Sequence, residues 1–220
     1  MNISRLETDN DFLWVNYTTK DISPEDFRKY AYILPTSMGK AIDAKKYEFI
    51  LGRLCSQKDL DNIYQIDKGL LGEPVFPTGI KGSISHSKDF VISVVSEDQS
   101  IRSLGIDIER CVDEKRMDVI KKMALTDEEI SYLDGYQGDK LRLATIIFSA
   151  KETLFKLLNP LCETYINFHE GIFSNFDEKK QQFEIRLVSD KPKLKTLLGV
   201  YSGEVFRVGN NFITLLCLQK

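Results

Sequence analysis

A regular stripe of apolar residues between positions 140 and 158 most constrains the fold of this chain. Its members recur three or four residues apart, the spacing of one buried helix face: Leu143, Ile147, Ala150, Leu154 and Leu158. Asn159-Pro160 should end this helix, because the residue before a proline avoids helical backbone angles. A helix with one apolar face must bury it against another element. The rest of the chain therefore has to supply a covering layer.

Strand patterns both precede and follow this helix. β-branched and aromatic residues gather in short runs bounded by turn residues, at 83–86, 90–96, 101–109, 168–173, 183–187, 203–208 and 212–218. Helices interleaved with turn-linked strands predict an α+β fold with largely antiparallel sheets. We place a division between two lobes at residues 103–104, which gives an N-terminal lobe of 1–103 and a C-terminal lobe of 104–220.

Two further helices are predicted. Thr126 and Glu129 have the spacing of a capping box, so a short helix should run from there to about Leu133 and stop near Gly135. An earlier helix is expected over 37–55, with candidate core positions Ala41, Ala44, Ile50, Leu51 and Leu54.

Composition excludes several classes of protein. The chain has 220 residues, 42% hydrophobic and 29% charged, with a formal net charge of −3, which argues against nucleic acid as the main partner. Acids by position 7 leave no room for a secretory segment, and no apolar run could span a membrane. Four cysteines without a C-x-x-C pair favour reduced thiols, namely Cys55, Cys111, Cys162 and Cys217. We expect a cytoplasmic protein that does not contact membranes.

An alternation of apolar and acidic residues marks Gly105-Ile106-Asp107-Ile108-Glu109. In a strand, Ile106 and Ile108 would point into a core, while Asp107 and Glu109 would share the opposite face. Taken alone, that face could simply be solvated. Glu152 and Lys156 lie one helical turn apart and could likewise form only a surface pair. Together, three carboxylates and a lysine suit a hard cation, Mg²⁺ or Mn²⁺, and a phosphorylated substrate.

Residues suited to phosphate occur in the first half. Gly82-Ser83-Ile84-Ser85-His86-Ser87 is small and polar, and its hydroxyl groups and imidazole could donate to a phosphate monoester. His86 could equally be a satisfied turn histidine. Lys45 and Arg53 follow at four-residue steps through Phe49, so they could clamp a second phosphate or form a solvated helix face.

These segments in this order resemble the motifs of the 4′-phosphopantetheinyl transferase superfamily. The matching stretches are Gly-Ser-Ile-Ser-His at 82–86, Gly-Ile-Asp-Ile-Glu at 105–109 and Phe-Ser-Ala-Lys-Glu-Thr-Leu-Phe-Lys at 148–156. Residues 46–53 and 72–77 resemble the branch that includes the enterobactin synthase component, which serves siderophore peptide synthetases. The ordered set is far more specific than any one motif.

The resemblance implies a reaction and a fold. Such enzymes move the 4′-phosphopantetheine arm of coenzyme A to a serine of an acyl or peptidyl carrier protein and release adenosine 3′,5′-bisphosphate. The carrier would belong to siderophore or other nonribosomal peptide or polyketide synthesis. The family fold is two similar α+β lobes related by a pseudo-two-fold axis, with the coenzyme cleft between them. We expect a monomer.

The resemblance also implies residue roles. Asp107, Glu109 and Glu152 would bind Mg²⁺, and Glu152, or a water that it holds, would accept the proton of the carrier serine, with Lys156 as its catalytic partner. The coenzyme-binding residues would be Lys45, Arg53, Lys68, Ser85, His86, Asp107, Lys151 and Lys156. Ser85, His86, Lys45 and Arg53 would hold the 3′-phosphate, and Lys151 and Lys156 the pyrophosphate.

Two other functions remain open from the sequence. A Mg²⁺-dependent phosphohydrolase would use the same acids and phosphate cradle. A coenzyme A-binding or carrier-binding protein without turnover would be expected to have lost motif acids or lysines, and all are present here. A carrier-facing surface could involve residues 126–146 and the apolar side chains of the preceding stretch, or those side chains could pack a helix into the core. They are Met117, Val119, Ile120, Met123 and Leu125.

Overall fold

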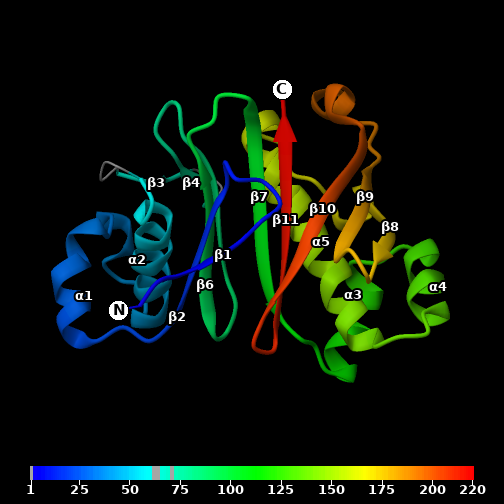
Figure 1. The fold of residues 1–220 in the computed structure, drawn as a ribbon, viewed down its shortest axis with the longest axis horizontal. Coiled ribbons are helices and arrows are strands. Elements are labelled where there is room, and N and C mark those ends of the chain that lie inside the picture. Colours follow the sequence, from blue (N-terminus) through cyan, green and yellow to red (C-terminus); the bar gives the residue numbers. More distant parts are fainter. Residues whose placement is uncertain (1, 61–64, 70–71) are drawn as a thin grey trace. The chain divides into compact units, whose positions relative to one another are not determined.

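The computed structural model describes residues 2–60, 65–69 and 72–220. The chain divides into two compact units, one of Met1–Leu104 with Gln219–Lys220 and one of Gly105–Leu218. The division lies within strand β7 (Ile101–Arg110). Helices and antiparallel sheets build both units, which confirms the predicted α+β class (Figure 1).

The first unit contains a four-stranded sheet in the order β1-β2-β6-β5. Its strands are β1 (Ser4–Leu6), β2 (Trp14–Thr19), β5 (Lys81–His86) and β6 (Phe90–Ser96), and neighbouring strands pair antiparallel. Helix α2 (Asp43–Gln57) packs on this sheet, chiefly on β6. Helix α1 (Pro24–Tyr30) lies beside α2, where the rings of Phe27 and Tyr47 meet edge to face.

Short elements complete the first unit. They are the 3-10 turns η1 (Ala31–Ile33) and η2 (Thr36–Met38), and the two-residue strands β3 (Asp67–Lys68) and β4 (Pro74–Val75), which pair with each other.

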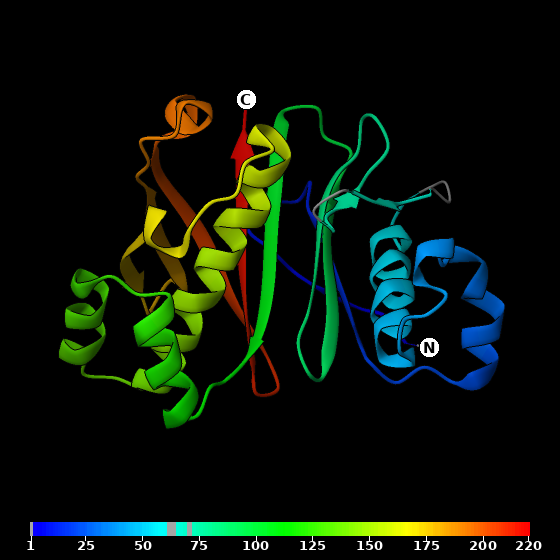
Figure 2. The same cartoon turned by 180° about the vertical axis from the view of Figure 1, so that it is seen from behind.

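The second unit contains a five-stranded sheet in the order β7-β11-β10-β9-β8. The strands after β7 are β8 (Gly171–Asp177), β9 (Gln182–Leu187), β10 (Gly199–Val208) and β11 (Asn211–Gln219). The helices are α3 (Glu114–Met123), α4 (Asp127–Gly135) and α5 (Lys140–Cys162), with the turns η3 (Phe168–Glu170) and η4 (Pro192–Leu197). Figure 2 shows α5 across this sheet, with α3 and α4 beside its N-terminal half.

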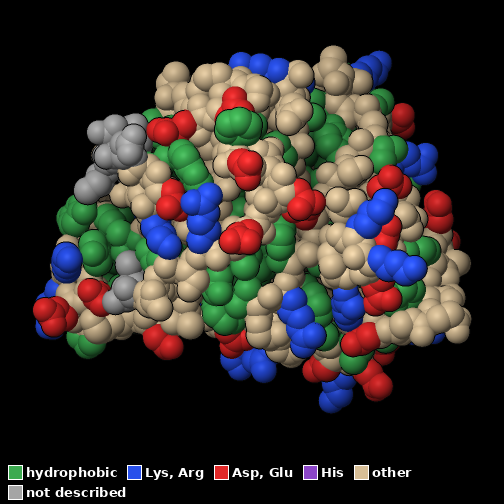
Figure 3. Space-filling view, in the orientation of Figure 1, with side chains coloured by type: hydrophobic (Ala, Val, Ile, Leu, Met, Phe, Trp, Pro, Cys, Tyr) green, Lys and Arg blue, Asp and Glu red, His purple; other side chains and the backbone are tan. Residues whose placement is uncertain are grey.

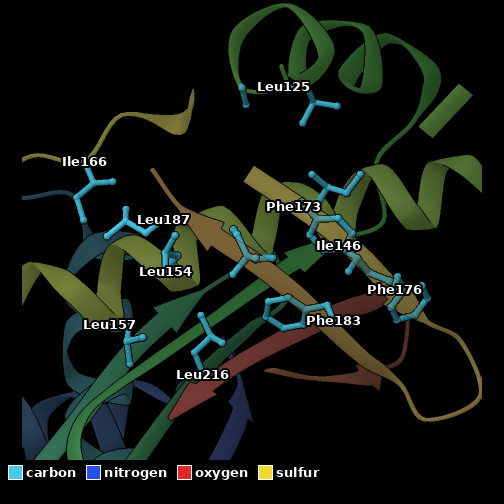
Figure 4. Close-up of a cluster of buried hydrophobic side chains, with 14 of the residues drawn as sticks. Leu125, Ile146, Leu154, Leu157, Ile166, Phe173, Phe176, Phe183, Leu187 and Leu216 are labelled. Carbon is cyan, nitrogen blue, oxygen red and sulfur yellow. The ribbon is translucent and has the colours of Figure 1, made fainter. Parts of the chain in front are cut away.

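Helix α5 buries the predicted stripe. Leu143, Ile147, Ala150, Leu154 and Leu158 are all almost completely buried. They belong to one apolar cluster with strand residues of β8, β9, β10 and β11, and Figure 4 shows Leu154 and Leu157 of α5 close to Leu187 and Leu216 of the sheet. Burying each such side chain contributes about 1.5–3 kcal/mol. The hydrophobic contact of α5 with the sheet is therefore the main source of stability in this unit.

The helix ends were predicted with mixed success. The capping box of Thr126 and Glu129 is confirmed, as is the end of α4 at Gly135. Asn159-Pro160 does not end α5, which continues to Cys162 and closes when the amide of Glu163 donates to the carbonyl of Asn159. A proline removes only one hydrogen bond, and its usual cost arises mainly in helix interiors. In the last turn of α5 the helix accommodates it.

Other boundaries were wrong. The helix expected over 37–55 starts only at Asp43, and Ala44 is exposed rather than in the core, although Ile50 and Leu51 are buried. The strand expected from residue 168 starts at Gly171, because Asn167 caps the 3-10 turn η3. Strands β5, β6, β7, β9, β10 and β11 occur where strands were expected, with small shifts of their ends.

Surface and thiol features agree with the composition. Basic and acidic side chains are intermixed over the face drawn in Figure 3. All four cysteines are free thiols, as expected. No helix within the described part of the chain is both long enough and apolar enough to cross a membrane.

Gly105 permits the close approach of α5 to β7, and its replacement tests this packing. A Cβ atom there would lie 2.3 Å from the Thr153 carbonyl oxygen and 2.9 Å from the Leu157 nitrogen, both backbone atoms. We expect Gly105→Ala to lower the free energy of unfolding by about 1–3 kcal/mol in urea denaturation. Gly135→Ala is the matched control, since nothing lies within 4 Å of its added methyl group. Equal stability of the two variants would contradict this packing.

Candidate active site

Strand β7 presents the acidic residues of the second unit. Ile106 and Ile108 are completely buried, as the alternation predicted. Asp107 is only 3% exposed and Glu109 is half-buried, so this face of the strand is not simply solvated. Helix α5 packs closely at Gly105 and brings Ser149, Glu152 and Lys156 to the same region. A buried carboxylate requires compensating partners, and Asp107 has them on α5.

Asp107 is held through both of its carboxylate oxygens. The ammonium group of Lys156 donates to Oδ1 at 2.6 Å, and the Ser149 hydroxyl donates to Oδ2 at 2.8 Å. The Lys156 side chain is 24% exposed, so its charge can reach solvent or a bound anion. Lys156 is therefore a cation in direct contact with an acidic residue of this unit.

Burial and neighbouring acids raise the pKa of the two carboxylates near Asp107. Burial raises the pKa of Glu109 to about 7, and the charges of Asp107 and Glu152 add to the shift against the opposing effect of Arg116 and Lys156. Burial also raises the pKa of Glu152, Asp107 raises it further, and Lys156 opposes both. The shifts show that Asp107, Glu109 and Glu152 interact electrostatically, in a region where an added cation would be favourable.

The donor set suits a hard divalent cation, which prefers carboxylate oxygens. Burial is the largest cause of the raised pKa values of Glu109 and Glu152, and the charge of Asp107 adds to both, which also fits a cation. In this conformation, however, no three acidic, histidine or cysteine side chains among residues 2–60, 65–69 and 72–220 are grouped closely enough to bind a metal ion. The chemistry of the residues fits Mg²⁺, while a compact ligand cluster is not formed.

Lys151 has a different role from the predicted pyrophosphate contact. Its ammonium group is buried and donates to Glu129 Oε2 at 2.8 Å and to the carbonyl oxygens of Phe168 at 2.8 Å and Gly171 at 2.6 Å. A lysine has three N–H donors, and these three acceptors use them all. Glu129 is fully buried and also accepts from the amides of Thr126 and Phe173. The pair joins α4, α5 and β8 and is structural.

A small pocket borders Glu152. Its volume is about 100 Å³, and its walls come from α5, the segment before β8 and β8 itself. Phe155, Tyr165, Ile166 and Phe168 make much of the lining apolar, while Lys151 and Glu152 lie on its α5 side. The pocket can therefore take an uncharged, partly apolar chain next to the acidic residues.

In the first unit, Glu48 contacts three basic side chains. It forms ion pairs with Lys20, with Lys45 at 2.8 Å and with His86 Nε2 at 3.4 Å. Burial acts to raise the pKa of Glu48, but the hydrogen bonds from Lys20 and Lys45 and the charge of His86 lower it overall. Lys45 and His86 are both exposed. One carboxylate with three basic neighbours leaves net positive charge that can attract an anion.

The other predicted phosphate residues lie differently. Arg53 is buried over the ring of Phe49, 3.5 Å from its centroid, and donates to the backbone carbonyls of Ile66 and Asp67. It supports the segment that carries the exposed Lys68 rather than pointing freely to solvent. Ser85 is buried on β5, one residue before His86. The structure thus groups Lys45 with His86 and gives Arg53 a packing role.

Sequence reasoning missed several residues of these sites. Lys20 lies 28 positions before Glu48, and no periodicity or motif connects them. Glu48 lies within residues 46–53, which resemble a family branch, but the sequence predicted no role for it. Tyr165 follows the long helix in a stretch without a clear pattern, and Phe168 was assigned only to a strand. Only the tertiary fold could have identified these residues.

Some of the apolar side chains predicted to face the carrier are buried, and others are exposed. Ile120 and Leu125 are buried in the core, and Met117 packs against it. Val119 and Met123 are exposed, at 43% and 65%, and lie four residues apart on one side of the helix. Of the five predicted side chains, these two are exposed enough to be the main apolar contacts for a partner.

Comparison with protein families gives two matches along the chain. Residues 103–214 match the 4′-phosphopantetheinyl transferase superfamily, and residues 35–96 match the 4′-phosphopantetheinyl transferase N-terminal domain. The first match covers the acidic strand, α5 and most of the second sheet. The second covers the cluster around Glu48 except for Lys20.

Three characterised proteins are similar over much of the chain. The 4′-phosphopantetheinyl transferase PptT of Mycobacterium tuberculosis is 28% identical over 180 residues, which cover 76% of this chain and 78% of PptT. Npt of Nocardia iowensis is 28% identical over 61% of each chain. Svp of Streptomyces mobaraensis is 27% identical over 70% of this chain and 64% of Svp. Both are also named 4′-phosphopantetheinyl transferases.

The raised pKa of Glu109 predicts a pH-dependent stability difference. The carboxyl group ionises in the unfolded chain near its ordinary pKa of 4.5 but in the folded chain only near 7. Its contribution to stability therefore falls as the pH rises through this window. We expect Glu109→Gln to match the wild type at pH 4 and to melt at a higher temperature at pH 8, in thermal unfolding followed by circular dichroism.

Glu184→Gln, at an exposed position of β9, is the control and should match the wild type at both pH values. A Glu109→Gln variant less stable than the wild type at pH 8 would contradict the electrostatic account of this strand.

Proposed function

The chain belongs to the 4′-phosphopantetheinyl transferase superfamily, and we propose that it transfers the 4′-phosphopantetheine arm of coenzyme A to a serine of a carrier protein. The serine Oγ would form a bond to the phosphorus that carries pantetheine, and the bond from that phosphorus to the bridging oxygen would break. The products are a phosphodiester on the serine and adenosine 3′,5′-bisphosphate. The serine proton must go to a base.

The observation that carries this proposal is the meeting of Asp107, Glu109, Glu152 and Lys156 in the second unit. Lys156 binds Asp107 directly, and the pKa shifts of Glu109 and Glu152 show that the acids share one electrostatic environment. Positioning and charge stabilisation make up most of the catalysis of phosphoryl transfer. A partly exposed lysine beside acids that interact electrostatically supports a site for a pyrophosphate and its counter-cation.

The acids of the site would hold the cation. Asp107, Glu109 and Glu152 supply oxygen ligands of the kind that Mg²⁺ prefers. A bound Mg²⁺ supplies charge neutralisation for the leaving phosphate. We propose that Lys156 contacts the same pyrophosphate, since its ammonium group is already held by Asp107 and remains partly exposed.

Glu152 is the proposed base for the serine proton, directly or through a water. Burial and Asp107 raise its pKa, which brings a carboxylate closer to the working pH and makes it a better proton acceptor. Glu152 also borders the small apolar pocket. We propose that this pocket takes one part of the uncharged pantetheine arm, since its volume of about 100 Å³ is below the roughly 300–1,000 Å³ of pockets that enclose a whole ligand.

In the first unit, Lys45 and His86 are the proposed ligands of the 3′-phosphate, with Lys20 as an additional donor. Their net positive charge around Glu48 supports this assignment. Ser85 and the exposed Lys68 remain proposed contacts of the coenzyme, and Arg53 would contribute by supporting the segment before Lys68. Lys151 is omitted, because its donors are all engaged within the protein.

The partner would be an acyl or peptidyl carrier domain from siderophore, nonribosomal peptide or polyketide synthesis. The resemblance of residues 46–53 and 72–77 to the enterobactin synthase branch supports this class. The exposed Val119 and Met123 on α3 would contact the carrier. We further propose that the enzyme acts as a cytoplasmic monomer.

The proposed reaction can be tested by intact-mass analysis. An apo carrier protein incubated with this protein, coenzyme A and Mg²⁺ should gain the mass of one phosphopantetheine arm, and EDTA should prevent the gain. Glu152→Gln should reduce the rate about 10²-fold or more, because the serine loses its base. Asp107→Asn should nearly abolish transfer while leaving the fold intact.

Two controls accompany this test. Glu184→Gln should retain the wild-type rate, since it is exposed on β9. Hydrolysis of coenzyme A without a gain of carrier mass would point instead to a phosphohydrolase. Coenzyme binding without either product, across acyl and peptidyl carriers, would point to a non-catalytic binder.

The basic cluster of the first unit makes a separate prediction. Lys45→Ala and His86→Ala should each raise KM for coenzyme A about tenfold, the value of one charge-assisted hydrogen bond, with little change for 3′-dephospho-coenzyme A. Lys29→Ala on α1 is the control and should change neither value. An equal rise of KM for both coenzymes would contradict the assignment of the 3′-phosphate to these residues.

A further inference from the structure

A chain of three buried hydroxyl groups leads to Asp107. The Thr153 hydroxyl lies 2.6 Å from the Thr214 hydroxyl, which lies 2.8 Å from the Ser149 hydroxyl, which in turn donates to Asp107 Oδ2 at 2.8 Å. All three side chains are completely buried. Ser149 and Thr153 lie one turn apart on α5, Thr214 is on β11 and Asp107 is on β7. The hydroxyl chain therefore connects the three elements that meet at the candidate site.

Hydrogen-bond chemistry gives the chain one direction. Asp107 accepts from the Lys156 ammonium group through Oδ1 and from the Ser149 hydroxyl through Oδ2, so Ser149 is the donor of the last bond. A hydroxyl has a single proton. Ser149 therefore accepts from Thr214, and Thr214 can accept from Thr153. The Thr153 Oγ1 also lies 3.2 Å from the Thr214 backbone carbonyl oxygen, so its proton is shared between the two acceptors. Such aligned bonds polarise one another, which strengthens the last bond to the carboxylate.

The hydroxyl chain restrains a torsion that is otherwise soft. The terminal torsion of an aspartate side chain has broad, roughly two-fold preferences. Ser149 fixes Oδ2, and this leaves Oδ1 directed at Lys156. Functional groups must be held in their productive geometry before reaction, and residues behind the ligands commonly provide that restraint.

We propose that Thr153, Thr214 and Ser149 act as positioning residues that orient Asp107 for its cation and for Lys156. The role of Asp107 as a cation ligand rests on the proposed function. The hydrogen bonds that hold its side chain do not depend on that function. It assigns these three hydroxyl groups a role beyond packing α5 on β11. Their effect should fall with distance along the chain, from Ser149 through Thr214 to Thr153.

The first test is a double-mutant cycle in unfolding free energy, which needs neither turnover nor metal. Thr214→Val keeps the shape of the side chain and removes its hydroxyl, and Asp107→Asn removes the charge to which the chain leads. Groups in one network give non-additive effects, so we expect the double variant to differ from the sum of the single ones. Thr145→Val is the matched control on α5. Its hydroxyl is also buried but donates to the Leu141 carbonyl and accepts from the Val112 amide, outside the hydroxyl chain, so its cycle with Asp107→Asn should be additive.

The second test measures Mn²⁺ affinity by electron paramagnetic resonance, with coenzyme A present. Loss of a group behind a metal ligand typically weakens binding about 10–100-fold, so we expect at least a tenfold loss for Ser149→Ala, a smaller loss for Thr214→Val and the smallest for Thr153→Val. Thr214→Ser retains the hydroxyl and should bind Mn²⁺ with wild-type affinity. Thr145→Val should also bind Mn²⁺ as the wild type does.

The outcomes separate this inference from the proposed function. An additive cycle for Thr214→Val with Asp107→Asn would overturn the inference, whatever the enzyme does. Mn²⁺ affinities that fell equally in Thr214→Val and Thr145→Val would also overturn it, because loss of packing would then explain both. A non-additive cycle in a protein that modifies no carrier would leave the positioning of Asp107 standing and overturn only the proposed reaction.

Discussion

The second unit depends on holding like charges near one another at the contact of α5 with β7. Asp107, Glu109 and Glu152 repel one another, and burial makes that repulsion stronger than in water. Lys156 and Ser149 compensate Asp107 directly. The contact itself requires Gly105, because a larger residue would collide with the backbone of α5. The close approach of α5 to β7 therefore also brings the acids near one another. The burial of the apolar stripe of α5 offsets the free-energy cost of their repulsion.

A second buried charge network has a different purpose. Glu129 and Lys151 neutralise each other and satisfy backbone groups of α4, η3 and β8. Breaking such a buried pair usually destabilises a protein, because it leaves one charge unpaired. Lys151 and Glu152 are adjacent and both border the pocket, yet the ammonium group of Lys151 is engaged by Glu129 and two backbone carbonyls. Adjacent motif residues on one helix therefore divide between structure and proposed chemistry.

Local patterns predicted the long elements well. The stripe of α5, the capping box of Thr126 and the alternation in β7 each follow from the periodicity or hydrogen bonding of nearby residues, and the structure confirms them. The end of α5 was wrong, because a proline in the last turn removes only one bond. The start of β8 was wrong, because a local cap at Asn167 forms a 3-10 turn first.

The candidate sites were less predictable from the sequence. The order of the sequence motifs identified five candidate site residues, namely Asp107, Glu109, Glu152, Lys156 and His86. The packing roles of Lys151 and Arg53 depend on acceptors more than ten residues away, which no local pattern reveals. Lys20 and the hydroxyl of Thr214 join their clusters only through tertiary contacts. Three-dimensional packing determines which basic and polar groups form hydrogen bonds within the protein and which stay available to a ligand.

We propose that the three acids bind one divalent cation, and proton release on Mg²⁺ binding tests this proposal most directly. Isothermal titration calorimetry at pH 7, with coenzyme A present and in buffers of different ionisation enthalpy, would measure that release. Because the pKa of Glu109 is raised to about 7, the account predicts that Mg²⁺ binding expels a fraction of a proton, and that Glu109→Gln reduces the fraction. Mg²⁺ binding without proton release, or release unchanged in Glu109→Gln, would contradict it.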